Sequence, residues 1–136
     1  WIDQGAHQAV GILEVPNRYM AGIAEVSLKK VFSDKTNWRK MLQNEHEEVQ
    51  WEKAINQAID LLPNDLKPYI ISGSNVIEID FPVLQYPKKI KSLNLEKENE
   101  FSGVLKGIKG QYLIFHDQTV FNIRSNEGTR VIIEID

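Results

Sequence analysis

The stretch GVLKGIKGQYLIFHDQTVFNIRSNEGTRVIIEID, residues 103–136, decides the fold of the C-terminal half of the chain. Short runs of aliphatic and aromatic residues are separated by connectors made of turn-forming residues. The runs are Gly103–Ile108, Tyr112–Phe115, Val120–Ile123 and Arg130–Ile135. Strands this short and evenly spaced predict antiparallel pairing in a curved or barrel-like sheet.

Strand-like patterns of apolar residues extend upstream to about residue 67. Before residue 66, the apolar residues recur at helical spacing instead. Asn75–Phe81 and Ile90–Leu95 predict two further strands. The N-terminal part predicts one strand at Ala6–Val15 and helices from Asn17 to about Phe32, around Trp38–Leu42 and at Glu45–Leu62. We therefore expect an α+β fold, in which residues 1–66 hold the strand and about three helices and residues 67–136 form an antiparallel β-domain.

Composition limits the class of protein. The chain has 136 residues, of which 42% are hydrophobic and 26% charged, and this suits one domain or two very small ones. It lacks cysteine, which excludes disulfides and thiolate metal sites, and folding should require no cofactor. No apolar run approaches the length of a membrane helix, so we expect a cytoplasmic protein without membrane contact. The chain starts at Trp1 without a methionine, so we expect a fragment of a longer protein.

Charge is segregated along the helical part. Residues 17–43 contain six basic and two acidic side chains, whereas residues 44–65 contain six acidic side chains and one lysine. One interpretation is a basic surface that meets nucleic-acid phosphates through Arg18, Lys29 and Arg39. The other is a pair of solvated helix faces of opposite sign.

Glu25 is the residue to which the sequence assigns a chemical hypothesis. It lies near the middle of the first predicted helix, seven positions after Arg18. Its carboxylate could hold a divalent metal ion, Mg²⁺ or Mn²⁺, while Arg18 contacts a phosphodiester. Alternatively, Glu25 forms an ordinary helical ion pair with Lys29, four positions later.

A second candidate surface lies in the β half. Lys106, Lys109, Gln111 and Arg124 stand near Tyr112 and Phe121 in the sequence, and basic residues interleaved with aromatic ones are typical of single-strand nucleic-acid binding. The alternative is an outward polar face with the aromatic side chains in the core. The glycines at positions 103, 107 and 110 are followed by no Gly-Lys-Ser/Thr, so they favour turns over a phosphate loop. The three histidines show no zinc-ligand spacing, and no serine sits in a nucleophile-elbow context.

Two sets of longer strings carry a resemblance. The first comprises WIDQGA (1–6), VPNRYMAG (15–22) and TNWRKML (36–42); the second comprises YP (86–87), KSLNL (91–95), GVLKGIKGQYLIF (103–115) and NIR (122–124). Together they resemble an uncharacterised bacterial family, domain of unknown function 2797. Full members of that family carry a cysteine-rich region and a strand pair before the tryptophan, which agrees with a fragment.

The middle region of that family is distantly similar to the GIY-YIG nuclease fold. The resemblance implies that Ala6–Val15 is the third strand of that fold and that Glu25 is its metal-binding glutamate. The tyrosine-bearing strands and the arginine would precede Trp1, so this chain alone should not cleave a substrate. The leading hypothesis is a fragment of a nucleic-acid-associated protein. The alternative is a non-catalytic binding or scaffold module whose β-domain engages a protein, peptide or small ligand.

Overall fold

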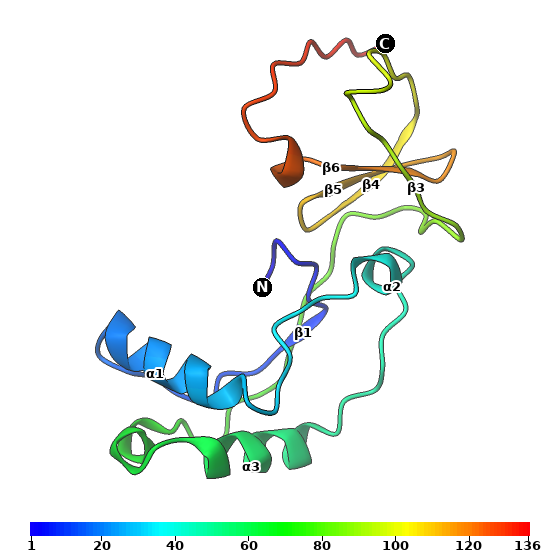
Figure 1. The fold of residues 1–136 in the computed structure, drawn as a ribbon. Helices are drawn as coiled ribbons and strands as arrows, with labels where there is room; N and C mark the ends of the chain where they lie inside the picture. Colours follow the sequence, from blue (N-terminus) through cyan, green and yellow to red (C-terminus); the bar gives the residue numbers. More distant parts are fainter. The chain divides into compact units, whose positions relative to one another are not determined.

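The structure, a computed structural model, describes all residues from 1 to 136. In chain order its elements are β1 (Gln8–Ala9), α1 (Arg18–Leu28), α2 (Trp38–Leu42), α3 (Trp51–Leu61), the 3₁₀ helix η1 (Asn64–Tyr69), β2 (Ile77–Glu78), β3 (Lys91–Ser92), β4 (Leu105–Lys109), β5 (Tyr112–Phe115), β6 (Thr119–Asn122) and the 3₁₀ helix η2 (Arg124–Asn126). Helices precede a β-rich region, which confirms the predicted α+β class (Figure 1). None of the helices combines the length and the apolar character that a membrane span requires.

Two compact units make up the chain, and each is assembled from separate segments. The sheet unit consists of residues 1–6, 38–45 and 80–136, and the helical unit consists of residues 7–37 and 46–79. The expected division into a domain of residues 1–66 and a domain of residues 67–136 stays a prediction.

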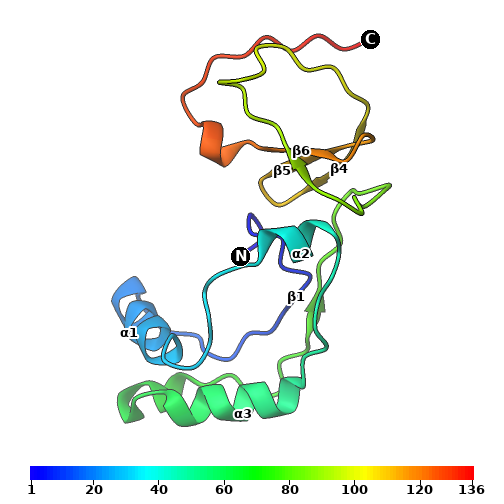
Figure 2. The same ribbon diagram turned by 45° about the vertical axis from the view of Figure 1, so that its right-hand side comes forward.

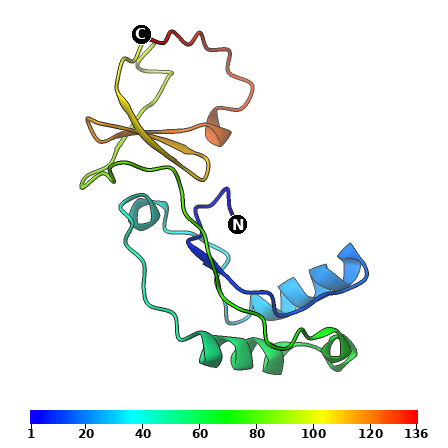
Figure 3. The same ribbon diagram turned by 180° about the vertical axis from the view of Figure 1, so that it is seen from behind.

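The helical unit packs α1 beside α3 (Figure 2). Asn17 begins α1 as predicted, because its side chain accepts a hydrogen bond from the backbone N–H of Met20 at 3.0 Å. Ala24, Leu62 and Leu66 are buried between the helices. Partly buried apolar side chains surround them: Leu13, Val15, Met20, Ile23, Leu28 and Ile70. The short strands β1 and β2 pair in antiparallel fashion, with Gln8 opposite Glu78 (Figure 3).

The sheet unit holds an open sheet of four strands in the order β3-β6-β5-β4. The β4–β5 hairpin turns at Gly110, whose φ of +57° lies in the left-handed region that favours glycine. One face of the sheet packs on α2, where Leu42 is fully buried against Tyr112, Ile114 and Val120. The core of this unit therefore joins a helix to strands that lie far from it in the sequence.

Several predicted strands are shorter in the structure or absent. Ala6–Val15 yields only β1 and a single bridge from Leu13 to Ile70, and Asn75–Phe81 yields only β2. Ile90–Leu95 yields only β3, which runs parallel to β6, so the sheet is not wholly antiparallel. Arg130–Ile135 forms no strand. An alternating pattern makes a strand only where a partner supplies hydrogen bonds, and these segments meet little or no partner backbone.

Two predicted helices are also shorter than expected. The first ends at Leu28 instead of continuing to about Phe32, and beyond it the N–H groups of Val31 and Phe32 both donate to the Leu28 carbonyl. The third begins at Trp51 instead of Glu45. The excluded segment carries several glutamates, and a helix that included Glu48 would place it one turn from Glu52, where like charges repel.

Candidate functional site

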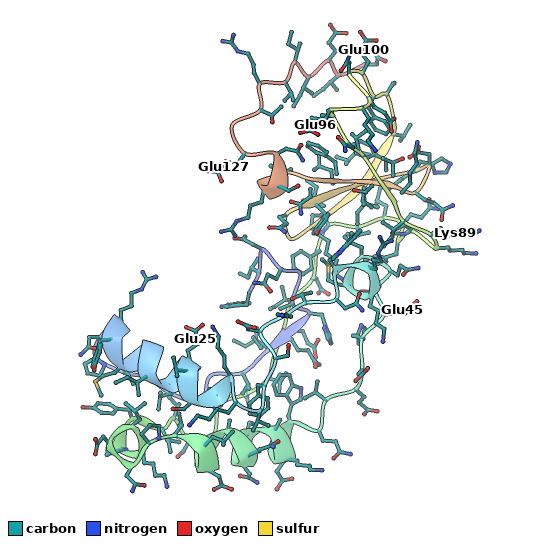
Figure 4. All side chains as sticks on the ribbon, in the orientation of Figure 1. Glu25, Glu45, Lys89, Glu96, Glu100 and Glu127 are labelled. Atoms are coloured by element: carbon teal, nitrogen blue, oxygen red, sulfur yellow. The ribbon has the colours of Figure 1, made fainter.

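Glu25 lies on α1, two turns after Arg18. The rise of about 1.5 Å per residue separates the two positions by roughly 10 Å along the helix axis. Both residues are exposed, and Figure 4 shows the Glu25 side chain on the side of α1 away from α3. The helix thus presents one carboxylate and one guanidinium to solvent without bringing them into contact.

Glu25 belongs to a cluster of three charged side chains. The Lys29 ammonium lies 2.9 Å from the Glu25 carboxylate and 3.1 Å from that of Asp34. The hydrogen bond to Glu25, followed by the one to Asp34, raises the pKa of Lys29. The bond from Lys29 in turn lowers the pKa of Asp34. The helical ion pair between Glu25 and Lys29, one of the two alternatives from the sequence, is therefore formed.

A groove of about 380 Å³ opens beside this cluster. Six of its lining residues are apolar and the others are polar or charged: Leu13, Val15, Ala21, Ala24, Leu28, Phe32, Ser33, Glu25, Lys29 and Asp34. The volume lies within the range of roughly 300–1,000 Å³ that is typical of small-molecule sites. The groove sits entirely within the helical unit.

No three His, Asp or Glu side chains come together in an arrangement that could hold a metal ion. The rings of His7 and His46 are in contact, with centroids 4.0 Å apart, but no third ligand joins them. Glu25 is therefore a single carboxylate donor, and a metal ion there would take its remaining ligands from water or substrate.

In the sheet unit, the Arg39 side chain lies over the stacked rings of Trp38 and Tyr112. Its guanidinium lies 4.5 Å from the centroid of the Trp38 ring. Trp38 in turn stacks on the buried Tyr112, with centroids 5.9 Å apart and planes inclined by only 8°. The stack fixes an exposed cation on an aromatic platform, which is a favourable arrangement for cation–π attraction.

Two basic segments that are distant in the sequence are joined by a hydrogen bond near this stack. The side chain of Gln43, which directly follows α2, donates a hydrogen bond to the Lys88 carbonyl at 2.6 Å and so joins the end of the helix to the turn before β3. The Lys89 backbone N–H donates to the Gln118 side chain at 2.7 Å, and Figure 4 shows Lys89 projecting outward. We call the resulting exposed group the α2 basic surface: Arg39, Lys40, Lys88 and Lys89.

The predicted face of the β half is divided between surface and interior. Lys106 and Gln111 are half-buried, and Arg124 is exposed 3.7 Å from the Asp3 carboxylate. Lys109 is only 3% exposed, so it does not belong to a surface that meets a ligand. Tyr112 is likewise buried, which agrees with the alternative of aromatic side chains in the core.

Lys109 occupies an aromatic site inside the sheet unit. Its ammonium donates a hydrogen bond to the Asn44 side chain at 2.9 Å and lies 4.9 Å from the Tyr86 ring centroid and 5.8 Å from that of Phe81. Burial lowers the pKa of Lys109. Asn44, which has a φ of +57° just after α2, is thereby tied to the end of β4.

The sequence did not single out Lys88 and Lys89. The sequence feature that could have indicated them is a pair of lysines directly after Pro87, but such pairs are common on protein surfaces. Only the fold joins their segment to the end of α2, since Arg39 lies roughly a third of the chain length before them. The candidate interface is therefore a product of tertiary structure.

A family model matches residues 1–131. The chain belongs to the family described as protein of unknown function (DUF2797). This membership confirms the family resemblance seen in the strings of residues 1–42 and 86–124. No curated protein and no solved structure matches the chain significantly.

Proposed function

We propose that this protein associates with nucleic acid and that the α2 basic surface contacts the phosphate backbone. The observation that carries the proposal is the hydrogen bond from Gln43, four residues after Arg39, to the Lys88 carbonyl, because it joins the two basic segments. Clustered cations release counterions when they meet a polyanion, and this gives affinity without sequence preference. The sheet unit provides this surface even though the net charge of the whole chain is −3.

The stacked Arg39 suggests a preference for single strands. A guanidinium held over an aromatic ring offers a planar cation on which an unpaired base can stack. Duplex bases are not available for such stacking. We therefore propose that single-stranded nucleic acid is the preferred form.

Removing two lysines of the surface tests the proposal. We expect K88A/K89A to weaken binding of a fluorescent single-stranded oligonucleotide about tenfold at low salt, because two phosphate contacts are lost. The slope of log Kobs against log salt should fall in magnitude by about 1.4, or roughly 0.7 for each contact. Fluorescence anisotropy over a salt series measures both quantities.

The matched control is K53A/K67A, which removes the same charge from two exposed positions of the helical unit. Its affinity and salt slope should stay close to those of the unmodified protein. Equal losses in the two double variants would show that net charge, not this surface, governs binding. Absence of any binding at low salt would reject nucleic-acid association.

We further propose that Glu25 holds Mg²⁺ or Mn²⁺ for phosphodiester cleavage in a longer protein that carries the GIY-YIG-like strands upstream of Trp1. The exposure of Glu25 beside a groove supports this role, as does the presence of Arg18 on the same helix. When bound, the metal would polarise a phosphoryl oxygen. Lys29 would then give up its bond with Glu25 and keep its bond with Asp34.

In that longer protein, we expect E25A to abolish metal-dependent cleavage of a labelled duplex, because the protein loses its carboxylate donor on α1. The control is E52A, which removes an exposed glutamate from the first turn of α3 and should leave cleavage intact. A gel-based assay with Mg²⁺ and with Mn²⁺ measures the rates. Unchanged cleavage by E25A would remove Glu25 from the mechanism.

A further inference from the structure

The C-terminal segment Val131–Asp136 exposes its aliphatic side chains to solvent. Ile132 and Ile135 are each 90% exposed, Ile133 is 77% exposed and Val131 is 52% exposed. Figures 1 and 2 show this segment as an extended arc outside the sheet. Its residues favour β-structure, since three of the six are isoleucine and one is valine. A contiguous run of exposed aliphatic residues of this kind marks an interaction site.

The sheet offers one open edge to receive a strand. The outer edge of β4 is covered, since Leu84 N–H donates to the Lys106 carbonyl at 2.7 Å and Ile108 N–H donates to the Pro82 carbonyl at 3.0 Å. Gly107 permits this approach, because a Cβ there would lie 2.8 Å from the Val83 backbone. The other edge is β3, whose partner in the sheet is β6.

The backbone of β3 points one of its amides toward that edge. The N–H groups of Lys91 and Leu93 donate to carbonyls of residues 118 and 120, on the side of β6. The intervening residue of an extended strand points its N–H the opposite way, so Ser92 directs its amide away from β6. An added strand would find this donor unpaired.

From this geometry we infer that Val131–Asp136 of one copy pairs with the β3 edge of a second copy. The same contact made in return closes a two-fold symmetric dimer, because each copy carries both the segment and the edge. The inference goes beyond the proposed association with nucleic acid and does not depend on it. Burial of the isoleucines and pairing of the Ser92 amide both favour the dimer.

Charge complementarity favours a second copy as the occupant of the edge. The edge strand begins with the exposed Lys91, whereas the segment ends with Glu134 and Asp136. Asp117 lies close enough to Lys91 for that lysine to help lower its pKa, but its carboxylate is already hydrogen-bonded to Thr119. Lys91 therefore remains able to face an incoming carboxylate.

Sedimentation velocity without nucleic acid, from micromolar to millimolar protein, tests the inference. We expect a dimer whose dissociation constant rises at least about hundredfold in I133D, because two symmetric contacts each lose a buried isoleucine. S92P should also weaken the dimer, because proline lacks the outward N–H and is tolerated at sheet edges. L84D is the control for the first variant, as Leu84 is 87% exposed beside the other edge, and it should leave the dimer intact.

Exchanging the charges of β3 and Val131–Asp136 tests whether these two segments pair with each other. K91E and E134K/D136K should each weaken the dimer, and the combined variant K91E/E134K/D136K should recover most of the loss. E127K, a charge change outside the segment, should have no effect. A protein that stays monomeric at every concentration would overturn the inference, as would a dimer that I133D leaves unchanged. A monomer in which the segment pairs with its own sheet would also overturn it.

Discussion

Lys109→Glu should lower the free energy of unfolding of the sheet unit by about 3–5 kcal/mol, which is the cost of an uncompensated buried charge. Lys109 is 3% exposed and directs its ammonium toward the rings of Tyr86 and Phe81. Ring faces attract cations and repel anions, so a carboxylate there loses its hydration without gaining a partner of opposite charge. Urea unfolding followed by circular dichroism measures the loss.

Two variants separate burial of charge from other effects. Lys106→Glu places the same carboxylate on the same strand at a half-buried position, where the expected cost is below about 1 kcal/mol. Lys109→Met keeps the aliphatic stem without a charge, and it should be far less destabilising than the glutamate. If Lys109→Glu lowered the free energy of unfolding as little as Lys106→Glu, position 109 would tolerate a negative charge.

The loss caused by Lys109→Glu should also depend on pH. Burial raises the folded-state pKa of the introduced carboxyl group above its unfolded value of about 4.3. The destabilisation is then fully present above the raised pKa, and it shrinks as the pH falls toward the unfolded value. Unfolding curves at neutral pH and near pH 4.5 would reveal the difference.

Leu42→Ala should cost the sheet unit about 3 kcal/mol. The side chain is fully buried and packs against Tyr112, Ile114 and Val120, so truncation removes apolar burial and leaves a cavity between α2 and the sheet. The loss appears as an earlier urea transition in circular dichroism and in tryptophan fluorescence, to which Trp38 of this core contributes.

Leu84→Ala is the matched control, because it makes the same truncation at a position that is 87% exposed. Its free energy of unfolding should stay within about 0.5 kcal/mol of that of the unmodified protein. If Leu42→Ala were equally mild, α2 would not be anchored to the sheet through this side chain.

Features that depend on neighbouring residues could be predicted from the sequence. The strand Tyr112–Phe115, the start of a helix at Asn17 and the short helix around Trp38–Leu42 were predicted correctly. In each case a few adjacent residues determine the backbone conformation through turn, cap or alternation preferences. The α+β class followed from the same local signals.

Features that depend on distant partners could not be predicted. The parallel pairing of β3 with β6 joins segments separated by a loop and two strands, and local alternation does not indicate direction. Arg130–Ile135 has a strong strand pattern but meets no partner within the described chain. The candidate sites divide in the same way. The Glu25–Lys29 pair was visible from spacing, whereas the burial of Lys109 and the hydrogen bond between Gln43 and Lys88 were not.

The segmented construction of the sheet unit also bears on how the chain folds. Its core joins Leu42 to strands in the last quarter of the sequence, and the Asp3 carbonyl accepts a hydrogen bond from Gln111 N–H at 2.9 Å. These contacts have large sequence separation, so long loops must close before any of the stabilising interactions form. During synthesis, α2 leaves the ribosome well before the strands that bury it. We therefore expect refolding at the slow rates typical of high contact order, with α2 unprotected from hydrogen exchange until the β5–β6 hairpin has formed.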